Sequence, residues 1–174
     1  MKANQETAKK ISITGKSTTL CIMKRFLLIT LTLTAFVLLL PGSGVVSTWE
    51  ADDIIGEWYT DGNEAIVRIY KNRHGRYFGR LEWIKDAYES DGSPKLDKEN
   101  PNRELRNRPL QGLVILRNFS FENNRWTGGT IYDPENGRTY SCTIRLNNRN
   151  TMHVRGYVGI SALGRTTTWT RKRN

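Results

Sequence analysis

The sequence predicts an all-β domain over residues 48–174, built as an eight-stranded antiparallel up-and-down barrel. Three observations lead to this prediction. Apolar and polar residues alternate with a period of two, which is the pattern of half-buried strands. Turn-forming residues interrupt the alternation at short intervals, and no amphipathic helix pattern of useful length occurs. Eight short strands in 127 residues suit a small closed barrel, whose closure removes exposed sheet edges. A β-sandwich is the alternative, but its crossovers need longer connections than most of those present.

Each expected strand is bounded by a turn signal. The segment 65–70 alternates and is followed by 77–84 across an Asn- and Gly-containing turn, which is a hairpin signature. The run 133–137, DPENG, is an equally clear turn signal. In chain order, the eight expected strands are 57–60, 65–70, 77–84, 111–119, 125–132, 138–146, 151–158 and 165–171.

One connection is much longer than the others. It spans residues 85–110, between the third and fourth strands, and it is rich in charge. Loops beyond ~12–15 residues tend to be functional or disordered, so we expect this one to form a lid over a barrel mouth. Arg106 and Arg108 stand near the rim, where Asp97 and Asn100 are short polar groups able to pair with them. The two arginines are therefore either ligands of an acidic head group or structural clamps of the loop.

The N-terminal part of the chain predicts export. Residues 26–40 are uncharged and apolar, follow two basic residues, and end at a Pro-Gly break and a run of small residues. These are the three parts of a secretory signal peptide, which we place at residues 23–47. The apolar run is shorter than the ~20 residues that span a bilayer. An uncleaved signal anchor and a buried helix are the alternatives. Cleavage before Thr48 gives a periplasmic or secreted protein without a stable membrane span.

Residues 1–22 precede this signal and are interpreted as a dispensable extension or the product of a misplaced start codon, with Met23 rather than Met1 as the true start. The remaining residues, 48–174, keep 21 bases, of which 16 are Arg, against 16 acids. A net charge of +5 suits solubility and does not indicate binding of nucleic acid. Cys142 is the single cysteine of this part, so no internal disulfide is expected.

No catalytic group is expected. A hydrolytic Ser/His/Asp set needs a positioned histidine, but His74 falls in a hairpin turn and His153 in the middle of a strand. Cys142 shares a strand face with apolar residues, which favours a small buried side chain over a nucleophile. No strand–turn–helix context is present for a phosphate site. We therefore expect a protein that is not an enzyme and that uses no metal or other cofactor.

Two sets of residues carry a resemblance to known proteins. Gly56-x-Trp58 opens the first strand as the G-x-W of lipocalins does, and Trp169-Thr170-Arg171 closes the last strand. The runs RNRPLQGLVIL, IYDPENG, GYVGIS and WTR then resemble the bacterial exported family known as domain of unknown function 2147. The resemblance covers about residues 55–171 and includes Asp97 and Asn100. It implies a lipocalin-like, calycin-type barrel in which Trp58 lies across the floor and Arg171 covers it.

The expected function is binding of a ligand. Arg155-x-Tyr157 and Arg138-x-Tyr140 each place a cation and a phenol on one strand face, similar to the Arg/Tyr pair that receives a carboxylate in intracellular lipid-binding barrels. The alternative is that these arginines face solvent. We expect an exported envelope protein that carries a small amphiphilic molecule, with or without an acidic group, in or at the mouth of the barrel. The candidate ligand-binding residues are Arg106, Arg108, Trp83, Tyr132, Tyr140, Arg155 and Tyr157. A plugged barrel that docks a partner protein of the envelope is the alternative, and a filled interior would favour it.

Overall fold

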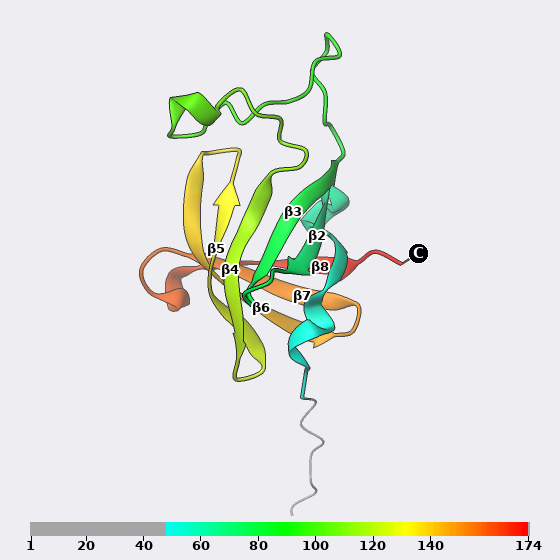
Figure 1. The fold of residues 1–174 in the computed structure, drawn as a ribbon, viewed down its shortest axis with the longest axis vertical. Coiled ribbons are helices and arrows are strands. Elements are labelled where there is room, and N and C mark those ends of the chain that lie inside the picture. Colours follow the sequence, from blue (N-terminus) through cyan, green and yellow to red (C-terminus); the bar gives the residue numbers. More distant parts are fainter. Residues whose placement is uncertain (1–47, 174) are drawn as a thin grey trace, which may run out of the picture. The chain divides into compact units, whose positions relative to one another are not determined.

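The structure is a computed structural model that describes residues 48–173, and Figure 1 shows its strands wrapped into a barrel. The predicted extension (1–22) and signal peptide (23–47) lie outside the described residues. Each strand pairs antiparallel with the next, and β1 pairs with β8 to close the barrel, so the predicted up-and-down topology is confirmed. The strands are β1 (Gly56–Tyr59), β2 (Ala65–Lys71), β3 (Tyr77–Ile84), β4 (Val114–Glu122), β5 (Arg125–Asp133), β6 (Arg138–Asn148), β7 (Thr151–Tyr157) and β8 (Arg165–Arg171).

The helices of residues 48–173 are short 3-10 turns in the segments that flank the strands. They are η1 (Ala51–Ile54), η2 (Asp61–Asn63), η3 (Arg103–Leu105) and η4 (Ser161–Leu163). Within this described part of the chain, no helix has the length and apolar character needed to cross a membrane.

The topology separates the connections into two groups. Because consecutive strands run in opposite directions, the connections after β1, β3, β5 and β7 meet at one end of the barrel. We call this end the mouth. The three short hairpin turns after β2, β4 and β6 meet at the other end, the closed end. The long connection after β3, residues 85–113, extends beyond the mouth end (Figure 1).

The fourth strand differs from the prediction. Expected at 111–119, β4 runs from Val114 to Glu122. Gly112 has a φ of +90°, which ends the extended backbone before Leu113, and Leu113 is buried without belonging to a strand. Towards its other end the strand passes an irregularity in its pairing with β3, where Asn118 has a φ of +65°, and it reaches the tight turn Asn123-Asn124. Both turn residues have positive φ, as a type I′ hairpin requires.

The closed end has the predicted arrangement of Trp58 and Arg171. Trp58 is fully buried, and the Arg171 guanidinium lies 4.1 Å from the centre of its ring. The same guanidinium donates hydrogen bonds to the carbonyl oxygens of Arg149, Ile55 and Asp53, at 2.7, 2.9 and 2.6 Å. Gly56 has a φ of +134°, and a Cβ there would lie 2.8 Å from Arg171 Nη1. Glycine is therefore needed at position 56 for its backbone and for its small size.

The interior of the barrel is filled by its own side chains below the mouth. Trp126 and Phe119 are fully buried, and the absence of a side chain at Gly129 makes room for the Phe119 ring. The predicted inward face of β6 is confirmed, because Cys142, Ile144 and Leu146 are buried while the residues between them are half-buried or exposed. Other large buried members of this core are Ile54, Ile69, Leu116, Met152, Val67 and Trp169. Any ligand site inside the barrel must therefore lie near the mouth.

Candidate functional site

A pocket of about 800 Å³ opens at the mouth, between the β5–β6 hairpin and the connection between β7 and β8. This volume falls within the range of small-molecule sites. We call it the mouth pocket. It is lined by Asp61, Ile131, Tyr132, Asp133, Pro134, Asn136, Tyr140, Val154, Gly156, Tyr157, Val158, Leu163, Gly164, Arg165 and Thr167.

The register of β7 explains why there is space at this point. Gly156 pairs with Cys142 on one side and with Arg165 on the other, so it belongs to the inward-facing row of residues. A Cβ on Gly156 would lie at ordinary contact distance, 3.5 Å, from Ile131 Cγ2. A longer side chain would project into the pocket. The missing side chain at position 156 therefore contributes directly to the open volume.

The walls of the mouth pocket are amphipathic. Ile131 and Val154 are apolar parts of the barrel wall, and Leu163 comes from the connection after β7. The phenol oxygen of Tyr140 accepts a hydrogen bond from Asn136 Nδ2 at 3.2 Å, which leaves the phenol proton available to another acceptor. The pocket thus offers apolar surface together with a few converging polar groups, as ligand pockets do.

A second hollow, of about 380 Å³, lies on the other side of the β5–β6 hairpin at the same end. Asp133 and Pro134 line both hollows, while Asp86, Lys95 and Leu110 contribute the wall from the long connection. The long connection is therefore a wall of this smaller hollow. It contributes no residue to the lining of the mouth pocket, which is a narrower role than the lid expected from the sequence.

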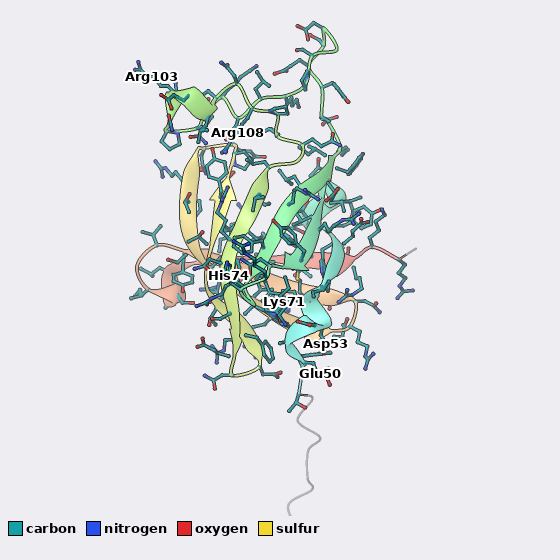
Figure 2. All side chains as sticks on the ribbon, viewed as in Figure 1. Glu50, Asp53, Lys71, His74, Arg103 and Arg108 are labelled. Atoms are coloured by element: carbon teal, nitrogen blue, oxygen red, sulfur yellow. The ribbon has the colours of Figure 1, made fainter. Side chains whose placement is uncertain are left out.

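A buried carboxylate ties the long connection to β5. Asp97 has no exposed surface, and its Oδ1 accepts a hydrogen bond from the Tyr132 phenol at 2.6 Å. Its Oδ2 accepts bonds from Arg108 Nε and Nη2, at 3.0 and 2.8 Å, and from Asn100 Nδ2 at 2.8 Å. Arg106 Nε donates to the Asn100 carbonyl oxygen at 2.7 Å. The expected pairing of these arginines with Asp97 and Asn100 is therefore present. Figure 2 shows Arg108 on the long connection, at the opposite end of the barrel from Asp53 of η1 and Glu50, which precedes it.

Burial changes the proton affinity of two groups near this end of the barrel. Burial, with a smaller effect of the hydrogen bond to Asp97, raises the pKa of Tyr132 to about 12. Burial also raises the pKa of the Cys142 thiol to about 12. Cys142 therefore stays protonated at neutral pH, which agrees with its expected role as a small buried side chain rather than a nucleophile.

The structure separates the candidate ligand residues into two groups. Tyr140 and Tyr157 line the mouth pocket, and Tyr132 contributes to its lining while its phenol belongs to the Asp97 cluster. Trp83 is exposed on β3 and lines neither hollow of the mouth. Arg106 and Arg108, as described above, are engaged within the long connection.

Arg155 also lies outside the mouth pocket. Its guanidinium donates to the carbonyl oxygens of Ser161 and Ala162, at 2.8 and 3.0 Å, and to Thr166 Oγ1 at 2.7 Å. It faces the outer side of the barrel and holds η4 against β8. The two residues of the Arg155-x-Tyr157 pattern therefore have different surroundings, and the cation is occupied by the protein itself.

Sequence reasoning missed Arg165, which does line the mouth pocket. Its position follows from the alternation along β8, because residues 165, 167, 169 and 171 form one row and Trp169 of that row is buried in the core. The signal was present in the sequence as the even spacing between Arg165 and Trp169. The Arg-x-Tyr patterns on β6 and β7 favoured Arg138 and Arg155 instead.

The family described as "Uncharacterized protein conserved in bacteria (DUF2147)" matches residues 56–171. The chain belongs to this family. Among solved structures, this DUF2147 member is similar to protein HP1028 from the human pathogen Helicobacter pylori, which is described as belonging to the lipocalin family. The TM-score is 0.60 at 24% sequence identity, over 74% of this chain and 86% of that chain, so the likeness shows a lipocalin-like fold. No curated protein matches the chain.

Proposed function

We propose that this DUF2147 member is an exported binding protein of the bacterial envelope, which holds a small amphiphilic molecule in its mouth pocket. The observation that carries the proposal is the amphipathic pocket of about 800 Å³ above a filled barrel interior. The lipocalin-like fold supports binding as the general activity. The proposal includes no catalytic role, since His74 and His153 are both exposed and lie on separate hairpins.

The filled interior limits how the ligand lies. Trp58, Trp126 and Phe119 occupy the lower barrel, so a long aliphatic chain cannot extend to the floor. The apolar part of the ligand would contact Ile131 and Val154, while its polar part stays near the rim. Export rests on the signal-peptide pattern of residues 23–47.

A second candidate is docking of a partner protein of the envelope. It is favoured by two observations. The barrel interior below the mouth is filled by its own side chains, and in the connection after β7 the residues Val158, Ile160 and Leu163 are 73%, 64% and 80% exposed. Val158 and Leu163 also line the mouth pocket, so the same apolar rim suits either a ligand tail or a partner surface.

A blocked pocket tests the first candidate. Gly156→Leu places an apolar side chain in the mouth pocket, while Thr170→Leu adds the same side chain at an exposed position of β8 that does not line the pocket. The probe is the neutral fluorescent amphiphile N-phenyl-1-naphthylamine, titrated at constant salt, with circular dichroism as the check on folding. We expect Gly156→Leu to weaken probe binding by about tenfold or more, which is a loss of about 1.4 kcal/mol, and Thr170→Leu to leave it unchanged.

Two outcomes would contradict ligand binding in the mouth pocket. If wild-type protein does not bind the probe, or if the two variants bind it equally, the mouth pocket is not a ligand site. A partner-docking role then becomes the better hypothesis for this end of the barrel.

A further inference from the structure

The arginines near the mouth are not equivalent. The side chains of Arg106, Arg108 and Arg155 all donate hydrogen bonds within the protein. The side chain of Arg165, by contrast, has no hydrogen-bond or ion-pair partner among residues 48–173, although it lines the mouth pocket. Its five N–H donors are therefore available to a ligand.

The position of Arg165 in β8 directs it to the pocket rather than to the outer face. It shares the inward row with Thr167, which lines the pocket, and with Trp169, which is buried. Its neighbour across the β7–β8 ladder is Gly156, which has no side chain to cover it. The guanidinium therefore borders the open volume that the glycine creates.

Two phenols border the same volume. Tyr140 Oη accepts from Asn136, so its own proton can be donated to a ligand, and Tyr157 has no hydrogen-bond partner for its phenol among the described residues. The guanidinium and the two phenols together offer several N–H and O–H donors on one side of the pocket. Such a set matches a carboxylate, which accepts two parallel bonds from arginine.

Two carboxylates also line the pocket and must be weighed against this. Asp133 is engaged in its own turn, because its oxygens accept from the Glu135 backbone N–H at 3.0 Å and from Asn136 Nδ2 at 2.8 Å. Asp61, on η2, has no such partner among the described residues. Asp61 therefore opposes the entry of an anion, and its removal provides a second test of the charge preference.

We propose that Arg165 is the residue that determines the ligand class, by binding the carboxylate of an amphiphile whose aliphatic part contacts Ile131 and Val154. This inference rests on the proposed function, since it assigns the head group for the same pocket. It selects a monocarboxylate over a neutral or cationic molecule of equal chain length.

The test compares three ligands that share one twelve-carbon chain: laurate, dodecanol and dodecylamine. Each is titrated, below its critical micelle concentration and at constant salt, against wild type, Arg165→Gln and Arg165→Lys. Arg117→Gln is the matched control, because Arg117 is an exposed arginine of β4 that does not line the pocket. Competition with N-phenyl-1-naphthylamine reports occupancy of the pocket for all three ligands.

We expect wild type to bind laurate more tightly than dodecanol or dodecylamine. Arg165→Gln should weaken laurate about tenfold and leave dodecanol unchanged, since the charge-assisted bonds of the guanidinium are lost but at an exposed site, where water replaces part of them. Arg165→Lys should restore part of the loss, because a single ammonium cannot make the bidentate contact. Arg117→Gln should have no effect beyond its small change in net charge, and Asp61→Asn should tighten laurate binding.

The two proposals fail in different ways. If dodecanol binds and Gly156→Leu blocks it, the mouth pocket is a ligand site whatever happens at Arg165. If Arg165→Gln then weakens laurate and dodecanol equally, or if dodecylamine binds best, the assignment of Arg165 to a carboxylate is overturned.

Discussion

The clearest prediction concerns the loss of Arg108 from the buried Asp97 cluster. Arg108→Gln removes two hydrogen bonds to a carboxylate that has no exposed surface, while the bonds from Tyr132 and Asn100 remain. Removing one partner of a buried ion pair costs about 3–5 kcal/mol. Because 31% of the Arg108 side chain is exposed, water replaces part of what is lost, and we expect about 2–3 kcal/mol.

The effect should appear first in the long connection rather than in the whole barrel. Residues 85–113 can detach while the eight-stranded sheet remains closed, since sub-global opening has a lower free energy than complete unfolding. The Asp97 amide, bonded to the Arg108 carbonyl at 3.0 Å, and the Leu110 amide, bonded to the Lys95 carbonyl at 2.9 Å, report this opening. Their hydrogen exchange should accelerate by about 30- to 150-fold, which is the factor equivalent to that free energy.

A matched control lies in the same segment. Arg103 is exposed on η3, its side chain has no partner among the described residues, and Figure 2 shows it on the long connection with Arg108. Arg103→Gln removes an equal charge and should leave amide exchange unchanged. Asp97→Asn combined with Arg108→Gln should cost less than the two single changes together, because the unpaired buried charge is then absent.

Equal exchange rates in Arg108→Gln, Arg103→Gln and wild type would refute the clamp. If, in addition, Arg108→Gln weakened laurate binding at unchanged stability, Arg108 would be a ligand residue, which is the other role that its position in the sequence allows.

Three further predictions follow from particular contacts. Trp58→Leu and Arg171→Ala should be non-additive in urea unfolding, with a coupling free energy of about 0.5–2 kcal/mol, because the guanidinium stacks on the indole; additive losses would contradict the stacking. The folded state raises the pKa of Tyr132 and of Cys142 to about 12, above their unfolded values, so both groups stabilise the fold below pH ~9–10 and lose that contribution as the pH rises towards 12. Stability measured from pH 8 to 12 should therefore fall less steeply in Tyr132→Phe and in Cys142→Ala, and an unchanged slope would count against the burial effect. N-terminal sequencing of protein recovered from the cell envelope should begin near Thr48, and recovery of the full-length chain would refute cleavage.

Seven of the eight strands could be located from the sequence to within two residues at each end. The period of two fixes which side chains face inward, and Asn/Gly or Asn-Asn turns mark where the chain reverses, so both signals are local. The exception, β4, shows the limit of this reasoning. Leu113 looks like a strand residue because it is apolar, but its burial comes from packing next to a turn at Gly112.

The sequence by itself determined the eight strands, their order and the residues of the closed end. The roles of Trp58 and Arg171 followed from the resemblance to lipocalins, and the pairing of β1 with β8 explains why the two residues meet. The sequence also indicated that Asp97 could pair with Arg108, because both residues lie in the same long connection.

Only the tertiary structure decided which polar groups remain available to a ligand. Asp97 and Tyr132 are 35 residues apart, and Arg155 bonds to carbonyl oxygens of a connection that follows no periodic pattern. A side chain in a strand has its direction set by alternation, but whether a partner already occupies it depends on which loops pack nearby. Arg106, Arg108 and Arg155 are engaged for this reason, whereas Arg165, beside a residue without a side chain, borders an open pocket. The volume of that pocket was likewise undetermined by the sequence, because it depends on how Phe119 and Trp126 fill the barrel in three dimensions.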